Sequence, residues 1–237
     1  MNTLKNAEQF QTILKHYQMS AQSVEILNST EFVMLSAISS SGRNTIIREL
    51  LRTDDFYFIV SDTTRAKRVN DGVMEQNGVE YWFRTEEDFL NDLKDGKYIE
   101  AAIIHNQQVS GVSIRELSIA KEKSKIAISD IEVQGVHNIM QHSKLAVPIF
   151  VLPPSYDEWI ERWMKRGTIS DEEYNNRVAS AKQELTMALN EDYYHFLIND
   201  DVAEAAKGVR QIAKGNISTK HDVRGREVAQ SILSKLK

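Results

Sequence analysis

The amino-acid sequence predicts an α/β fold built around a parallel sheet. Short apolar runs rich in β-branched residues alternate along the chain with segments whose apolar residues recur at helical spacing. Of the 237 residues, 41% are hydrophobic and 27% are charged, which allows a sizeable core and excludes wholesale disorder. The chain has no cysteine, so disulfides, thiolate nucleophiles and cysteine-ligated metal centres are excluded.

The N-terminal segment, residues 1–30, is predicted to be a helical extension of this fold. Apolar residues share one helical face at Leu4, Ala7, Phe10, Leu14 and Tyr17. Ser20 is placed to cap a second short helix that ends at Leu27. We expect this extension to pack on the body of the protein or to form a homodimer.

The alternation of strands and helices begins at residue 31. Buried strands are predicted at Phe32–Ala37, Phe56–Val60, Lys125–Ile131 and Val147–Leu152. Helices are predicted over Thr45–Leu51, 113–123, 156–166, 171–189 and 200–213. Ser113 and Ser170 each precede a glutamate by three residues, which is the spacing of a capping box. In folds of this class, ligands bind beyond the carboxyl ends of the parallel strands.

The charge is spread unevenly along the chain. Lys and Arg number 29 against 34 Asp and Glu, and the net charge of −5 argues against general nucleic-acid binding. Residues 205–237 are the exception, with eight basic side chains and two acidic ones. Apolar residues stand at near-helical spacing there, at Val228, Ile232, Leu233 and Leu236. We therefore predict a basic C-terminal helical tail over 214–237 that docks on the acidic body, with nucleic-acid contact as the alternative.

Nothing in the sequence predicts a membrane partner. No apolar run approaches the roughly 18 residues that a membrane span needs. The first residues, MNTLKNAEQFQ, lack the apolar core of a signal peptide. We expect a cytoplasmic protein.

The first predicted strand runs directly into a stretch with the position and length of a phosphate-binding loop, Ala37-Ile-Ser-Ser-Ser-Gly-Arg-Asn-Thr45. The pattern G-x-x-x-x-G-K-[ST] is met only in part, because Ala37 replaces the first glycine, Arg43 the lysine and Asn44 the Ser/Thr that would bind Mg²⁺. Backbone N–H groups at a helix N-terminus attract phosphate whatever the side chains, and Arg43 keeps the positive charge. A plain connection between strand and helix is the alternative for this stretch.

Further sequence blocks follow in a fixed order. They are Ser61-Asp-Thr-Thr-Arg65-Ala-Lys-Arg68, Gly78-Val-Glu-Tyr81, Tyr98-Ile-Glu100-Ala, Asp130-Ile-Glu132-Val-Gln-Gly135, Pro153-Pro-Ser155, Arg162-Trp-Met-Lys-Arg166-Gly-Thr168, Arg177 and Asn199-Asp-Asp201. In this order and at these spacings, over residues 32–205, they resemble the guanylate kinase family.

The resemblance implies both a fold and an activity. The fold is a P-loop kinase core with a small nucleotide-monophosphate-binding subdomain and a helical lid. The activity is transfer of the ATP γ-phosphoryl group to GMP or dGMP, with Mg²⁺. On this basis the kinase domain spans 31–213, with the monophosphate-binding insertion at 61–112 and the lid at 163–178.

Matching positions imply the site residues. The loop residues Ser39, Ser40, Ser41, Gly42, Arg43, Asn44 and Thr45 would bind the ATP phosphates, and Asn199 would lie by the adenine. Ser61, Arg65, Arg68 and Tyr81 would hold the acceptor phosphate. Glu100 would accept from N1 and N2 of guanine, with Glu132 near the acceptor base.

The remaining implied roles concern the metal and the transferring phosphoryl group. Asp130 and Glu132 are two apart on a predicted strand, hence on one side of it. Asn44 and Asp130 would ligate Mg²⁺. Arg162, Arg166 and Arg177 would be lid cations that act with Arg43 and Asp130 on the phosphoryl group.

Two further departures from the family pattern bear on specificity. The family commonly contacts guanine with a Tyr-Gly-Ser/Thr segment, where this chain has Ser110-Gly111-Val112, and the stretch between Arg68 and Tyr81 is longer than usual. Three hypotheses follow: an active ATP:GMP phosphotransferase with a variant loop, a related module that has lost catalysis and keeps nucleotide or protein binding, and a kinase for another small phosphorylated acceptor. The persistence of the acceptor and lid cations favours an enzyme.

Overall fold

The computed structural model describes residues 4–70, 72–104, 106–165, 170–216 and 219–236. The chain forms two compact units. The first unit comprises the segments up to Phe32, Phe58–Ala127 and Asn138–Ala146, and the second comprises Val33–Tyr57, Ile128–His137 and the segment from Val147 onward. Among the described residues, no helix has both the length and the apolar character that crossing a membrane requires.

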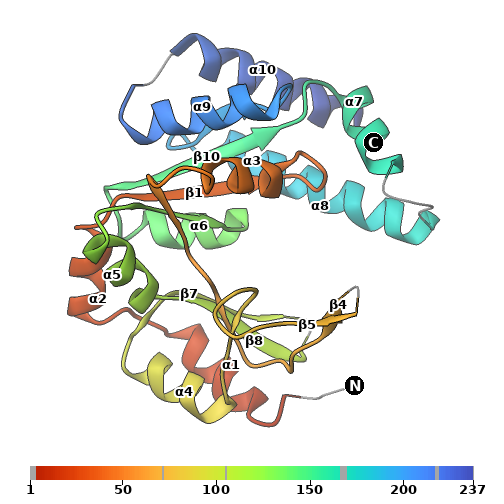
Figure 1. Ribbon diagram of the computed structural model, residues 1–237. Coiled ribbons are helices and arrows are strands. Elements are labelled where there is room, and N and C mark those ends of the chain that lie inside the picture. Colours follow the sequence, from red (N-terminus) through yellow and green to blue (C-terminus); the bar gives the residue numbers. More distant parts are fainter. Residues whose placement is uncertain (1–3, 71, 105, 166–169, 217–218, 237) are drawn as a thin grey trace. The chain divides into compact units, whose positions relative to one another are not determined.

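The second unit is built on a five-stranded sheet in the order β11-β10-β1-β9-β2 (Figure 1). Its strands are β1 (Phe32–Ala37), β2 (Phe56–Phe58), β9 (Ile126–Asp130), β10 (Ala146–Leu152) and β11 (His195–Ile198). β10 and β11 run parallel. Most side chains of β1 and β10 are buried, as their apolar runs predict. The α/β class with a parallel sheet, predicted from the sequence, is confirmed.

Helices cover both faces of this sheet. They are α3 (Arg43–Leu50), α6 (Val133–Met140), α7 (Tyr156–Met164), α8 (Asp171–Leu189), α9 (Val202–Ala213) and α10 (Thr219–Lys235). Figure 1 shows α9 and α6 on opposite sides of β1 and β10. The side chain of Ser170 accepts a hydrogen bond from Glu173 N and caps α8, as its sequence spacing predicts.

The C-terminal helix α10 docks on the second unit along the edge strand β11. It buries Ala229 and Ile232, and Leu236 directly after the helix is buried as well. The carboxylate of Asp222 accepts from the backbone N–H of Phe196 at 2.9 Å, so a donor of the edge strand is paired within the chain. Arg226 lies over the Phe196 ring at 4.8 Å.

The first unit holds a four-stranded sheet in the order β6-β3-β8-β7. Its strands are β3 (Asp62–Thr63), β6 (Trp82–Phe83), β7 (Tyr98–Ile104) and β8 (Gln108–Ser113), and its helices are α1 (Ala7–Lys15), α2 (Ala21–Leu27), α4 (Glu86–Lys94) and α5 (Ile114–Glu122). Helix α1 belongs to its core, because Phe10 and the preceding Leu4 join α4 and β7 in one buried cluster. The predicted cap of α2 is present, since the Ser20 side chain accepts from Ser23 N.

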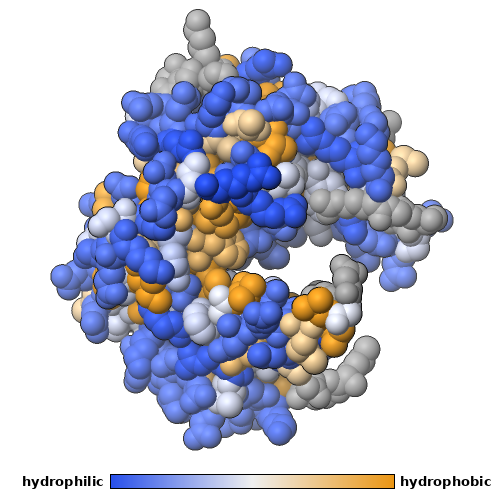
Figure 2. Space-filling view, in the orientation of Figure 1, coloured by the Kyte–Doolittle hydropathy of each residue, from blue (hydrophilic) through white to orange (hydrophobic). Residues whose placement is uncertain are grey.

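A small hairpin, β4 (Val69–Asn70) and β5 (Val73–Met74), projects from the first unit. It lies in the stretch between Arg68 and Tyr81. Exposed apolar side chains gather on the hairpin and just after it (Figure 2), at Val69, Val73, Met74 and Val79.

Two local predictions fail because partners distant in sequence override them. β2 ends at Phe58 and does not reach Val60, whose N–H donates to the Glu116 carboxylate at 3.2 Å. The Ser113 side chain caps α5 by accepting from Arg115 N, and not from the Glu116 N–H that a capping box uses. The Glu116 side chain is fully buried and accepts from the Trp82 indole at 3.0 Å.

Candidate active site

The predicted phosphate loop connects the end of β1 to the start of α3 and has a strained backbone. Gly42 has φ +89°, and a Cβ there would lie 2.2 Å from Asn199 Nδ2, so the position requires glycine. Ser40 has φ +69°, in the left-handed region where a side chain costs about 1–2 kcal/mol. Strain of this kind persists where the surroundings hold it, and it is concentrated at functional sites.

The loop also holds buried polar atoms that lack partners. Ser40 is 8% exposed and Ser41 1% exposed, and neither hydroxyl has a hydrogen-bond partner among the described residues. The same is true of Asn199 Oδ1, while Asn199 Nδ2 donates to the Ser41 carbonyl at 2.8 Å. A buried polar group left unpaired costs about 1–3 kcal/mol, so these atoms are suited to a polar ligand. Serine hydroxyls donate to phosphate oxygens, and the Asn199 oxygen accepts from a ligand N–H.

A pocket of about 230 Å³ lies against this loop. Its lining residues are Ser40, Gly42, Thr45, Arg162, Asn199, Asp200 and Val202. The structure therefore brings together loop residues, one predicted lid cation and the residue predicted to lie by adenine.

Arg43, the first residue of α3, meets one of the predicted carboxylates. Its Nη2 lies 3.3 Å from Asp130 Oδ2, and both side chains are partly exposed. Asp130 is the last residue of β9, and Glu132 lies beyond the strand, before α6 begins. The prediction that Asp130 and Glu132 share one side of a strand is wrong, because the strand ends before Glu132.

Glu184 of α8 is a further carboxyl near these groups. Its pKa is raised to about 7, mainly by burial and also by repulsion from Glu132, while Arg43 acts in the opposite direction. Its Oε2 is buried with no hydrogen-bond partner among the described residues. The sequence carried a signal for Glu184, since it adjoins Leu185 and lies three residues after Ala181 on the buried side of a helix.

Two of the three predicted lid cations, Arg162 and Arg177, pair with glutamates on their own helices. Arg162 Nε donates to Glu158 at 2.8 Å, and Arg177 pairs with Glu173. The Arg177 guanidinium also lies 5.3 Å from the centre of the Trp163 ring. Arg166, the third predicted lid cation, lies outside the described residues.

In the first unit, Arg65 is held by a residue that sequence reasoning missed. Its Nη1 and Nη2 donate to the Glu75 carboxylate at 2.5 and 2.8 Å, and this hydrogen bonding raises the pKa of Arg65. Glu75 also accepts from Arg68 N at 2.8 Å, whereas the Arg68 side chain is exposed. The Arg65 guanidinium lies 4.7 Å from the centre of the Tyr81 ring. Arg65 and the backbone of Arg68 are thus held by one buried glutamate, and Tyr81 lies against Arg65.

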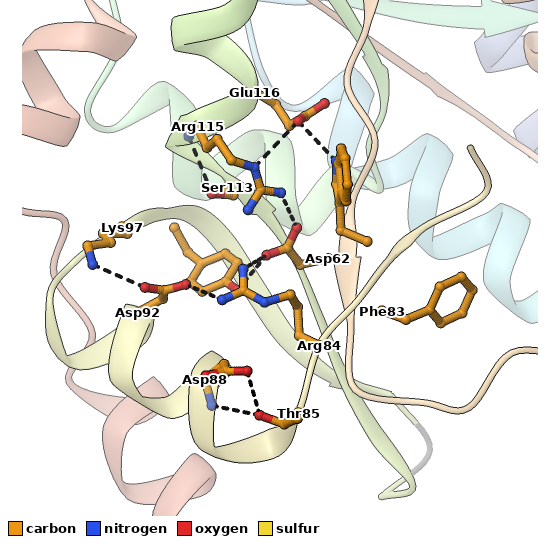
Figure 3. Close-up of polar contacts among 12 residues, drawn as sticks. Asp62, Phe83, Arg84, Thr85, Asp88, Asp92, Lys97, Ser113, Arg115 and Glu116 are labelled. Carbon is orange, nitrogen blue, oxygen red and sulfur yellow. Dashed lines mark hydrogen bonds and ion pairs between the residues drawn. The ribbon is translucent and has the colours of Figure 1, made fainter. Parts of the chain in front are cut away.

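Ser61, the remaining residue predicted to bind the acceptor phosphate, precedes a buried ionic network (Figure 3). The Asp62 carboxylate is fully buried and accepts from Arg84 at 3.0 Å, Arg115 at 2.7 Å and the Tyr98 hydroxyl at 2.8 Å. The backbone carbonyl of Ser61 accepts from Trp82 N at 2.9 Å. The network fixes β3, which directly follows Ser61 and leads to Arg65.

Glu100, the residue predicted to recognise guanine, lies on β7 opposite Val112 of β8. Directly opposite residues of an antiparallel pair point to the same side of the sheet. Val112 is buried and has no polar atom on its side chain, so of this pair only Glu100 offers a side-chain hydrogen bond.

Comparison with known proteins agrees with this geometry. The family model for guanylate kinase matches residues 29–215. This chain belongs to the guanylate kinase family. It is 31% identical over 180 residues to the guanylate kinase of Clostridium tetani, a match that covers 76% of this chain and 83% of that protein. It is 32% identical over 191 residues to the guanylate kinase of Corynebacterium jeikeium, covering 79% and 98%.

A solved structure supports the same assignment. The crystal structure of guanylate kinase from Anaplasma phagocytophilum matches with a TM-score of 0.53 at 28% identity, over 85% of this chain and 94% of that one. Helices α1, α2 and α10 lie outside the residues that the guanylate kinase family model matches.

Proposed function

We propose that this guanylate kinase family member transfers the γ-phosphoryl group of ATP to GMP or dGMP, releasing ADP and the nucleoside diphosphate. The phosphate loop supports this function most strongly. It keeps a strained backbone at Ser40 and buries unpaired hydroxyls at Ser40 and Ser41, although its sequence departs from the usual pattern. A loop that served only as a connection would gain nothing from either feature.

On the donor side, the residues of the second unit would bind and orient ATP. The backbone N–H groups at the start of α3 and the two serine hydroxyls donate to phosphate oxygens. Arg43, which is 3.3 Å from Asp130, would turn part of its guanidinium fork toward the β- and γ-phosphates. Asn199 would accept from the adenine amino group with the oxygen that has no partner among the described residues.

On the acceptor side, the residues of the first unit would bind GMP. Ser61, Arg65, Arg68 and Tyr81 would hold its phosphate. Glu100 would accept from guanine N1 and N2, and Glu132, which the chain places after β9, would lie near the base.

The lid cations would complete the site. They would neutralise negative charge on the phosphoryl group in the transition state, and they are Arg162, Arg166 and Arg177. Because Arg162 and Arg177 are paired with glutamates in the described chain, each would exchange a carboxylate for phosphate when the substrates bind.

Mg²⁺ bound with ATP neutralises phosphate charge in this chemistry. Asn44 and Asp130 offer an amide oxygen and a carboxylate, the hard ligands that Mg²⁺ prefers. Among the described residues, no group of three or more His, Cys, Asp or Glu side chains forms a metal site by itself. This fits an ion that takes one or two protein ligands and shares the substrate phosphates.

A coupled assay of ADP release tests the function. The protein is given ATP and Mg²⁺ with GMP, dGMP, AMP, CMP or UMP in turn, and ATP alone measures background hydrolysis. We expect release above background with GMP and dGMP and little with the other monophosphates. Release with none of the five would exclude the kinase, and a preference for another one would reassign the acceptor. The cytoplasmic location and the homodimer stay predictions.

A further inference from the structure

The phosphate loop is tied from two directions at the residues that flank its strained serine. On one side, the indole Nε1 of Trp159 donates to the Ser39 carbonyl at 2.6 Å. On the other side, Asn199 Nδ2 donates to the Ser41 carbonyl at 2.8 Å. Ser40, with φ +69°, lies between the two tied carbonyls.

A serine in this conformation needs support that glycine would not need. Glycine populates positive φ as readily as negative φ, whereas other L-residues do so at an energetic cost. Ser40 therefore tends to relax toward ordinary backbone angles, and such a rotation would move the Ser39 carbonyl away from its place. A fixed donor aimed at that carbonyl opposes the rotation.

Trp159 is such a donor. It is fully buried on α7, and its ring is stacked on Trp163 at 5.2 Å between centroids. Trp163 stacks in turn on Tyr174 of α8 at 5.3 Å, so the indole is held by both helices that border residues 166–169. A side chain clamped in this way cannot follow a moving loop, which makes its hydrogen bond an effective restraint.

We infer that Trp159 is a positioning residue, whose indole N–H holds the phosphate loop in its ATP-binding conformation. The loop needs this restraint because Ser40 occupies a backbone position suited to glycine. This inference rests on the proposed function only in that the loop binds ATP. The same bond links the loop to the aromatic stack beneath Arg177, so the loop and the lid helices share one support.

The test is a double-mutant cycle on ATP binding, measured by titration calorimetry without GMP. Trp159→Phe keeps an aromatic ring in the stack and removes the N–H. We expect it to weaken ATP binding about 10-fold, the scale of one lost hydrogen bond. In the Ser40→Gly background the backbone at position 40 is unstrained, so the same substitution should weaken ATP binding less than about 3-fold.

Trp163→Phe is the matched control. It makes the same indole-to-phenyl change in the same stack, but Trp163 Nε1 is buried with no partner among the described residues. Its effect on ATP binding should therefore be equal in the Ser40 and Ser40→Gly backgrounds. An isosteric analogue at position 159, benzothienylalanine, keeps the full ring volume without the N–H and serves if Trp159→Phe does not fold.

The outcomes distinguish the positioning role of Trp159 from the proposed kinase function. Equal effects of Trp159→Phe, or of the analogue, in both backgrounds would overturn the link to Ser40, and undiminished ATP binding would overturn the positioning role. A wild-type protein that binds ATP but transfers nothing to GMP would refute the proposed function and leave Trp159 with its role. A wild-type protein that binds no ATP would refute both.

Discussion

Asp62→Asn is expected to destabilise the protein by about 3 kcal/mol, because Asp62 is the central anion of a buried network (Figure 3). The carboxylate is fully buried and accepts from two arginines and from the Tyr98 hydroxyl. An asparagine of the same shape removes the charge and directs an NH₂ group at one of these donors. Removing one partner of a buried ion pair costs about 3–5 kcal/mol.

The lower end of that range applies here for a structural reason. Arg84 keeps a second carboxylate, Asp92, at 2.8 Å, and the Arg115 side chain is 39% exposed, so water reaches it. Since β3 leads to the acceptor-phosphate residues, the KM for GMP should rise while the KM for ATP stays near the wild-type value.

Urea unfolding at neutral pH measures the change, with Asp92→Asn as the control. Asp92 pairs with the same Arg84, but its side chain is 22% exposed, so its loss should cost less than about 1 kcal/mol. Equal losses of unfolding free energy for Asp62→Asn and Asp92→Asn would refute the reasoning, because burial of the carboxylate would then not affect stability. So would an Asp62→Asn cost below about 1 kcal/mol.

Two further substitutions give distinct signatures. Glu100→Gln should lower the preference for GMP over AMP, because a carboxylate that accepts two guanine N–H bonds is lost, and it should leave the KM for ATP unchanged. An unchanged GMP preference in steady-state kinetics would contradict the role of Glu100 in guanine recognition. Burial raises the pKa of Glu184 from 4.5 to about 7, so wild-type stability falls as the pH rises between these values. Glu184→Gln should therefore be more stable than wild type by up to about 3 kcal/mol at pH 8 and by less than about 1 kcal/mol at pH 5. Urea unfolding at the two pH values tests this, and a gain that does not depend on pH would count against the shifted pKa.

The parts of the fold that depend on local pattern could be predicted from the sequence. β1 and β10 follow from apolar runs, and the caps at Ser20 and Ser170 follow from the spacing of a hydroxyl residue before a helix. Where a distant residue competes, prediction fails. Glu116 is expected to take part in a capping box, but its buried carboxylate accepts hydrogen bonds from the Val60 N–H and the Trp82 indole.

The same division holds for the candidate site. The phosphate loop is one contiguous stretch, so its location follows from a strand that runs into a helix. The supporting residues lie between 10 and 120 positions from the residues they hold: Glu75 supports Arg65, Asp62 supports two arginines, and Trp159 supports Ser39. No spacing rule relates such pairs. The positive φ of Ser40 could not be predicted either, because serine does not favour it.

Arg43 provides the most direct test that the altered loop performs phosphoryl transfer. Turnover with ATP, Mg²⁺ and GMP is measured side by side for wild type, Arg43→Ala and Arg43→Lys. We expect wild type to be active and Arg43→Ala to be slower by about 10²–10³, the scale for deleting one group that stabilises the transition state. Arg43→Lys should also be slower than wild type, because a single ammonium does not reproduce a guanidinium fork set against Asp130. A wild type no faster than Arg43→Ala, with activity appearing in Arg43→Lys, would show instead that the loop has lost its catalytic function.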